Sequence, residues 1–217
     1  MSKVSIPTTC FERVTEVLPY RLSVGLIVFV ERLQGLDFEW RVEAEEAGLD
    51  PSHARWSSPS GNKYLRAVLN DLAISENDAI IDVGCGKGSA MRTMLMFPFS
   101  RVAGIELSRR MVEIARQNFK KLRQLSNRCV VTLSDASEFT DYDLFNHIYF
   151  YNPFGSTTMS RVVNNLTRSI ERNPRKVFVI YNTPACHDEI IRYGQFSMIG
   201  DYANVGPKRI YVYSNAY

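Results

Sequence analysis

The sequence predicts an α/β fold: a doubly wound, mostly parallel sheet with an antiparallel last strand and an N-terminal helical extension. From residue 79 onward, short apolar segments alternate with amphipathic helical segments, and such repeated strand–helix units form parallel sheets with helices on both faces. The last two apolar segments are separated only by turn residues, which predicts a closing hairpin. The region before residue 56 is helical and then irregular. We therefore assign residues 1–55 to the extension and residues 56–217 to the sheet domain.

Composition and charge are those of an ordinary globular protein. Of 217 residues, 45% are hydrophobic and 23% charged, and the net charge of +3 is too small to indicate nucleic-acid binding. The four cysteines lie far apart and have no histidine partners, so we predict no metal site and a reducing, cytoplasmic compartment. The longest apolar run is residues 22–30, whereas a membrane span needs about 20 residues. We therefore expect no transmembrane segment.

The elements of the extension follow from hydrophobic spacing. Residues 11–36 are expected to be helical, with a second segment that begins near Pro19, because apolar side chains recur at helical intervals. Residues 56–61 are rich in Ser, Pro and Gly and predict a loop. A helix is predicted over residues 63–72.

The sheet domain contains seven predicted strands. Helices are expected at residues 89–96, after a capping serine at position 108, and at residues 159–172. The predicted strands are residues 79–83, 101–106, 129–133, 147–151, 176–181, 196–202 and 209–213.

Polar and glycine residues follow the first three strands, at the sheet edge where ligands bind in open parallel sheets. Asp82 precedes a loop, residues 84–88, whose three glycines allow a sharp turn and a close ligand. Glu106 ends the second strand, where a carboxylate accepts hydrogen bonds from both hydroxyls of a ribose. Asp135 follows the third strand and can accept from an adenine amino group. These strand ends together fit one adenosine.

A dinucleotide is the competing ligand. The glycine spacing is GxGxG with Ser89 next, whereas the dinucleotide fingerprint is GxGxxG. Lys87 is interpreted as a solvated loop lysine and not as a phosphate ligand. An NAD(P)-dependent oxidoreductase and a non-catalytic cofactor-binding scaffold stay open as alternatives at this point.

Four ordered motifs resemble those of the class I S-adenosylmethionine-dependent methyltransferases. They are IDVGCGKG at residues 81–88, VAGIEL at 102–107, SDA at 134–136 and NPFG at 152–155. The resemblance implies a seven-stranded Rossmann-like sheet, S-adenosylmethionine as cofactor and S-adenosylhomocysteine as product. It also implies that the glycines approach the methionine part, that Glu106 holds the ribose and that Asp135 holds the adenine. The implied cofactor-binding residues are Asp82, Gly84, Cys85, Gly86, Gly88, Glu106, Leu107, Asp135, Ala136 and Asn152.

The fourth motif also bears on the methyl acceptor. Asn152, Pro153 and Phe154 resemble the [Asp/Asn]-Pro-Pro-[Tyr/Phe] motif of methyltransferases that act on nitrogen, although this chain has one proline in place of two. A nitrogen acceptor, either a protein lysine or another amine, is therefore favoured. The alternative is O-methylation of a glycan or small molecule, which needs a general base, and His187 is the candidate.

The extension is expected to act with loop 56–61 as a lid over the acceptor pocket. On that hypothesis, deletion of residues 1–50 abolishes transfer and spares cofactor affinity. The sequence identifies neither the acceptor nor the oligomeric state.

Overall fold

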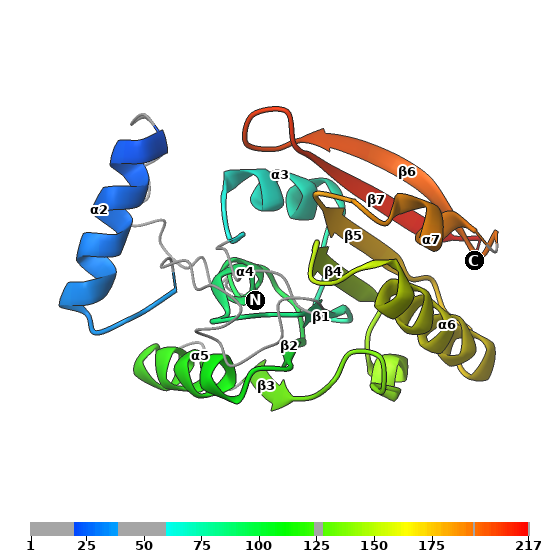
Figure 1. The fold of residues 1–217 in the computed structure, drawn as a ribbon, viewed down its shortest axis with the longest axis horizontal. Helices are drawn as coiled ribbons and strands as arrows, with labels where there is room; N and C mark the ends of the chain where they lie inside the picture. Colours follow the sequence, from blue (N-terminus) through cyan, green and yellow to red (C-terminus); the bar gives the residue numbers. More distant parts are fainter. Residues whose placement is uncertain (1–19, 39–59, 124–127, 193, 217) are drawn as a thin grey trace.

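A single sheet of seven strands forms the centre of the molecule, shown in the computed structural model of Figure 1. The strand order is β3-β2-β1-β4-β5-β7-β6; strands β1 to β5 pair in parallel, and β7 is antiparallel to both of its neighbours. The structure describes residues 20–38, 60–123, 128–192 and 194–216. The strands are β1 (Ala79–Val83), β2 (Arg101–Glu106), β3 (Cys129–Leu133), β4 (His147–Tyr151), β5 (Phe178–Asn182), β6 (Phe196–Ala203) and β7 (Arg209–Asn215).

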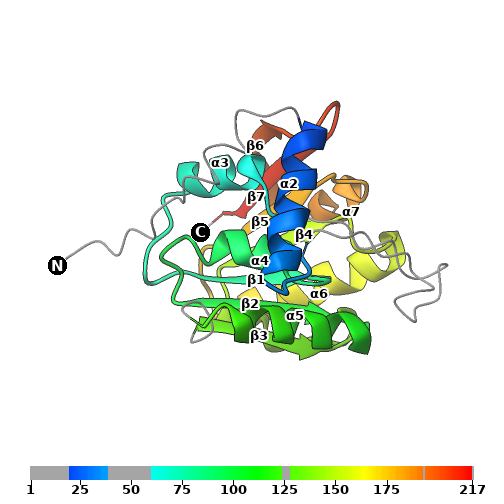
Figure 2. The ribbon, with the colours of Figure 1, turned by 90° about the vertical axis from the view of Figure 1, so that its left-hand side faces the viewer.

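Helices cover both faces of the sheet (Figures 1 and 2). Strand side chains alternate between the faces: Ile80 joins the core under α3, α4 and α5, whereas Ile81 joins the core under α6, α7 and the 3-10 helix η2. The predicted doubly wound sheet with an antiparallel last strand is thereby confirmed. The helices are α2 (Tyr20–Leu33), α3 (Lys63–Asp71), α4 (Ser89–Met94), α5 (Arg109–Lys121), η2 (Asp141–Leu144), α6 (Ser156–Arg172) and α7 (His187–Ile191).

Capping side chains explain where two of the helices begin. The Oδ1 atom of Asn62 accepts hydrogen bonds from the backbone N–H groups of Tyr64 and Leu65, at 3.0 and 3.2 Å, and starts α3. The Oγ atom of Ser108 accepts from the N–H of Met111 at 3.4 Å and starts α5. Each cap satisfies N–H groups that a first helical turn leaves without partners. The predicted cap at Ser108 is confirmed.

The predicted boundaries differ from the observed ones in a few places. Helix α6 begins at Ser156 instead of residue 159, and β5 begins at Phe178 instead of residue 176. Helix α7 has five residues and η2 has four, too few to show a helical period in the sequence, and neither was predicted. The helical segment predicted before Pro19, most of the loop at 56–61 and the boundary after residue 55 lie outside the described residues.

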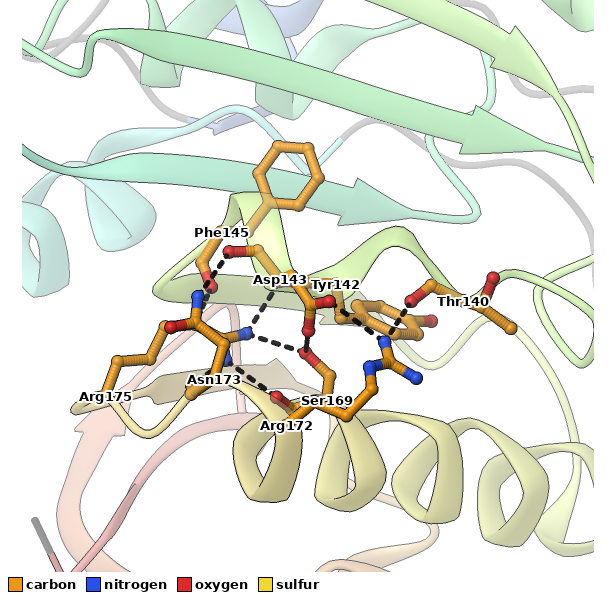
Figure 3. A network of polar contacts seen from close by, with 8 residues as sticks. All are labelled: Thr140, Tyr142, Asp143, Phe145, Ser169, Arg172, Asn173 and Arg175. Atoms are coloured by element: carbon orange, nitrogen blue, oxygen red, sulfur yellow. Dashed lines mark hydrogen bonds and ion pairs between the residues drawn. The ribbon is translucent and has the colours of Figure 1, made fainter.

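A polar network fastens the carboxyl-terminal end of α6 to η2 (Figure 3). Arg175 donates to the carbonyl oxygen of Tyr142 at 2.7 Å, and Arg172 pairs with Asp143 at 3.0 Å. Ser169 donates its hydroxyl to the same aspartate. Because η2 precedes β4 and α6 precedes β5, the network lies at the amino ends of the strands. The opposite, carboxyl edge is formed by loops that lead out of the strands.

Helix α2 lies outside the layers that cover the sheet (Figures 1 and 2). The residues that follow it return to the domain, and Leu36 and Phe38 are buried in the core shared by α3, α4 and α5. Within the described residues, no helix has both the length and the hydropathy needed to cross a membrane.

Candidate functional site

The loop after β1 is folded back over β2 at the carboxyl edge. The backbone N–H groups of Gly84 and Cys85 both donate to the carbonyl oxygen of Ile105, at 2.9 and 3.0 Å. Gly84 has φ +82°, and a Cβ atom there would lie 2.6 Å from the Cβ atom of Pro153. Only glycine accepts both this backbone conformation and this contact. The loops that follow β1 and β4 therefore touch each other.

Glu106 closes the next strand and organises the same loop. Its Oε2 atom accepts from the N–H of Gly86 at 3.0 Å, and its Oε1 atom accepts from the N–H of Ser108 at 2.8 Å. Burial raises the pKa of Glu106, and these backbone hydrogen bonds oppose that rise. The carboxylate has about four acceptor positions, and the backbone N–H of Leu107 also approaches it, so acceptor capacity for a ribose hydroxyl remains.

Asp82 lies beneath the glycine loop and is buried. Two causes raise the pKa of Asp82 to about 8: burial is the larger, and the neighbouring negative charge of Glu106 is the smaller. A positively charged ligand group bound near this carboxyl would reverse that effect and favour its ionised form.

The stability of the protein without cofactor should depend on Asp82 between pH 4 and pH 8. The folded chain retains a proton on Asp82 that the unfolded chain releases near the ordinary pKa of 3.8. The unfolded state therefore binds fewer protons in this range, so the free energy of unfolding falls as pH rises and becomes level above about pH 8. Asp82→Asn should remove this contribution.

Denaturant unfolding at pH 5.5 and pH 8.5 checks this prediction. The loss of unfolding free energy between the two pH values should be smaller in Asp82→Asn than in the wild type. Asp135→Asn, an exposed aspartate at the same sheet edge, is the matched control and should behave as the wild type. An equal loss in Asp82→Asn and the wild type would contradict the prediction.

The remaining predicted cofactor residues differ in exposure. Leu107 and Asp135 are exposed, and Ala136 is half-buried. The Oδ1 atom of Asp135 accepts from the N–H of Ser137 at 2.8 Å, which orders the turn after β3. Cys85 is buried, and a Cβ atom added to Gly104 would lie 2.7 Å from its thiol sulfur. The thiol of Cys85 therefore packs against β2, and its backbone N–H is already bonded within the domain.

Asn152 follows β4 and combines a strained backbone with a side-chain oxygen that has no hydrogen-bond partner among the described residues. Its φ is +41°, in the left-handed region that side-chain-bearing residues rarely adopt. Its Oδ1 atom is buried and has no hydrogen-bond partner among the described residues. Such strain combined with a free polar atom is typical of binding sites.

Phe154 and His187 are already engaged within the fold. The ring of Phe154 is buried and contacts the ring of Phe150 edge-on, with centroids 6.2 Å apart, in the core under α6. The Nδ1 atom of His187 lies 2.8 Å from the hydroxyl oxygen of Tyr213, and its ring also contacts Tyr211. Stacking of Phe154 on an acceptor and proton transfer by His187 stay predictions.

A buried polar network at the ends of β4 and β5 was not predicted. The amide of Asn182 donates to the hydroxyl of Tyr149 at 3.1 Å, and its Oδ1 atom accepts from Asn204 at 2.6 Å and from Thr183 at 3.1 Å. Asn204 lies in the turn between β6 and β7 and is 6% exposed, yet its Oδ1 atom has no partner in the described part of the chain. Burial raises the pKa of Tyr149, which keeps this hydroxyl neutral.

Sequence reasoning missed this network because asparagines are ordinary turn and strand-end residues. The one available signal was the presence of Asn182 at the end of a strand, next to Thr183. Thr183 has φ +54°, the same unusual region as Asn152 on the neighbouring strand.

The interpretation of Lys87 as a solvated lysine is wrong. Its side chain is buried, and its ammonium group pairs with Asp37, 50 residues earlier in the sequence. A buried ammonium requires such a partner, and the partner comes from the N-terminal extension.

The arrangement fits S-adenosylmethionine. The glycine loop after β1 and the carboxylate of Glu106 lie together at the carboxyl edge, where the resemblance expects the methionine and ribose parts of that cofactor. The exposed Leu107 offers an apolar surface next to the ribose position. Among the described residues, no group of three or more His, Cys, Asp or Glu side chains is placed to hold a metal ion.

Comparison with known proteins finds a methyltransferase domain in this chain. Residues 80–173 match the family model described as a methyltransferase domain. The O-methyltransferase cnsE of Penicillium expansum is 31% identical over 70 residues, which are 32% of this chain and 25% of that protein. This chain therefore spans about a quarter of the length of that curated relative.

Two solved structures share the fold. An RNA methyltransferase from Salinibacter ruber in complex with S-adenosyl-L-homocysteine is 16% identical with a TM-score of 0.55, covering 72% of this chain and 93% of that one. The glycopeptide N-methyltransferase MtfA complexed with S-adenosylmethionine is 11% identical with a TM-score of 0.59, covering 72% of this chain and 94% of that one. Residues 80–173 thus match a methyltransferase domain, and the strand order of the whole sheet is that of the S-adenosylmethionine-dependent methyltransferase fold.

Proposed function

We propose that the protein transfers the methyl group of S-adenosylmethionine to a nitrogen atom of its acceptor. The observation that carries this proposal is the pair of buried carboxamide oxygens, Oδ1 of Asn152 and Oδ1 of Asn204, that have no partner among the described residues. A buried oxygen without a partner costs free energy unless a ligand donates a hydrogen bond to it. The amino group of an amine or amide supplies such donors.

The topology supports a common location for these two oxygens. Asn152 directly follows β4, whose last residue, Tyr151, is paired in register with Asn182 at the end of β5. Asn204 donates to that same Asn182. Strand β6 runs parallel to β5, because both are antiparallel to β7. The turn after β6 therefore lies at the carboxyl edge, with the ends of β4 and β5.

When bound, S-adenosylmethionine supplies a methyl group on a positively charged sulfur atom. The task of this chain is then to align the acceptor nitrogen and exclude water. Neutral carboxamide oxygens hold N–H groups without contributing a charge, and the left-handed backbone at Asn152 fixes the direction of one of them. An oxygen acceptor needs a base, and His187, the candidate for that role, is hydrogen-bonded to Tyr213.

The test is transfer of labelled methyl from S-adenosylmethionine into fractionated lysate of the source organism, followed by mass spectrometry of the labelled product. We expect N-methyl groups in the labelled fraction and no label with a Gly86→Arg variant, since φ at Gly86 is +52° and a long side chain would fill the cofactor loop. Methyl ethers or esters in place of N-methyl groups would contradict the nitrogen assignment. Binding of S-adenosylhomocysteine without any label would favour the scaffold alternative.

A further inference from the structure

The last turn of α2 and the residues that follow it are attached to the cofactor loop by contacts that no sequence motif indicated. This segment, residues 31–38, is here called the strap. Glu31, at one end of the strap, contacts both α4 and the other end. Its carboxylate accepts hydrogen bonds from Arg92 of α4 at 2.8 Å and from the backbone N–H of Phe38 at 3.3 Å. The ring of Phe38 packs edge-on against Phe119 of α5, with centroids 5.6 Å apart. The strap is thus fixed to both helices that flank the glycine loop.

The centre of the strap contacts the loop itself. The side chain of Asn118 in α5 accepts from the N–H of Asp37 at 2.9 Å and donates to the carbonyl oxygen of Asp37 at 2.8 Å. The same amide group donates to the carbonyl oxygen of Lys87 at 3.3 Å. One buried carboxamide therefore joins α5, the strap and the cofactor loop.

An ion pair completes the connection. The ammonium group of Lys87 is buried and pairs with the carboxylate of Asp37, which is 48% exposed. The residue after it, Gly88, has φ +88°, and a Cβ atom there would lie 2.6 Å from the ring of Phe119 and 3.7 Å from the ring of Phe38. The backbone of Gly88 therefore lies against Phe119 of α5 and Phe38 of the strap, and without the strap the buried ammonium of Lys87 would lose the carboxylate of Asp37.

We infer that the strap is a positioning element of the cofactor site: Asp37, Asn118 and Lys87 hold the glycine loop in the shape that binds the cofactor. Cofactor affinity then depends on a segment far upstream of the first strand. This differs from the lid hypothesis, under which removal of the extension spares cofactor affinity. The inference rests on the proposed function for the identity of the cofactor, and it goes further by assigning a task to the extension.

Asp37→Asn in the full chain isolates the ion pair, because asparagine keeps the shape of the side chain and the backbone hydrogen bonds to Asn118. Asp201→Asn is the matched control: Asp201 is 44% exposed and pairs with Arg209 in the hairpin of β6 and β7. Calorimetric titration with S-adenosylhomocysteine should show about tenfold weaker binding for Asp37→Asn, and binding within about twofold of the wild type for the control. The double variant Asp37→Asn/Lys87→Met, which removes the unpaired ammonium, should recover part of the lost affinity.

A second measurement separates loop positioning from a general loss of stability. Amide hydrogen exchange of residues 84–89, without ligand, should be faster in Asp37→Asn than in the control, while the strands of the sheet exchange at equal rates. Affinity and loop exchange equal to the control would overturn the inference. If the wild type itself binds no S-adenosylhomocysteine, the proposed function fails, and the exchange rates then support or overturn the positioning role independently.

Discussion

Replacement of Glu106 by alanine should weaken the binding of S-adenosylhomocysteine by about a hundredfold. The carboxylate accepts hydrogen bonds from the buried N–H groups of Gly86 and Ser108. A buried donor left without an acceptor costs about 1–3 kcal/mol, which destabilises the loop conformation that binds the cofactor; a cost of about 2.7 kcal/mol for restoring that conformation on binding corresponds to about a hundredfold in affinity. The contacts that Glu106 offers to the ribose are lost in addition.

Calorimetric titration measures this effect directly. Glu106→Gln retains one oxygen acceptor and should lose less affinity than Glu106→Ala. Glu138→Ala removes an exposed glutamate after β3 and should bind as the wild type. Affinity of Glu106→Ala within about threefold of the wild type would show that the side chain neither shapes the loop nor contacts the cofactor.

Replacement of Asn152 by glycine should slow methyl transfer by about a hundredfold and leave cofactor affinity nearly unchanged. The variant removes the free Oδ1 atom, which we propose holds the acceptor nitrogen. Glycine accepts the φ of +41° without strain, so the backbone of the loop is preserved. A displaced acceptor no longer lies in line with the methyl group, and small displacements of this kind have large effects on rate.

The matched control is Ala73→Gly. Ala73 also has a left-handed backbone, with φ +49°, but it follows α3 and precedes the amino end of β1. The methyl-transfer rate of Ala73→Gly, measured with the lysate fraction that the wild type labels, should equal that of the wild type. Equal rates for Asn152→Gly and Ala73→Gly would remove Asn152 from the acceptor site.

The fold was predictable because its signals are local. Short apolar segments ending in glycine or a carboxylate, such as β1 with Asp82 and β2 with Glu106, show both the strand and the edge at which it ends. The closing hairpin was visible from the turn residues between β6 and β7. Helix α7 was not, since five residues cannot establish a helical period.

The sequence indicated site residues only where a residue type has one common role at that position of the fold. A carboxylate at a strand end predicted a ribose contact for Glu106, which stays a prediction, and the structure adds the hydrogen bonds that orient this side chain. The sequence position of Phe154 does not show which face of the sheet its ring occupies; the ring packs into the core, and its stacking on an acceptor stays a prediction. The contact of Asp37 with Lys87 joins residues 50 positions apart. Nothing local marks either of them as a partner.

The position of β7 determines the order in which the protein can be completed during its synthesis. This strand comes last of the seven in the sequence but lies between β5 and β6. On the ribosome, β6 therefore emerges before the strand that attaches it to the sheet, and β5 stays an unpaired edge until then. The hydrogen bonds and the ion pair that join the glycine loop to the strap involve residues 31–118, whereas Asn204 is brought to Asn182 only after β7 is inserted. We therefore expect a nascent chain to form the contacts around its glycine loop before those of Asn204.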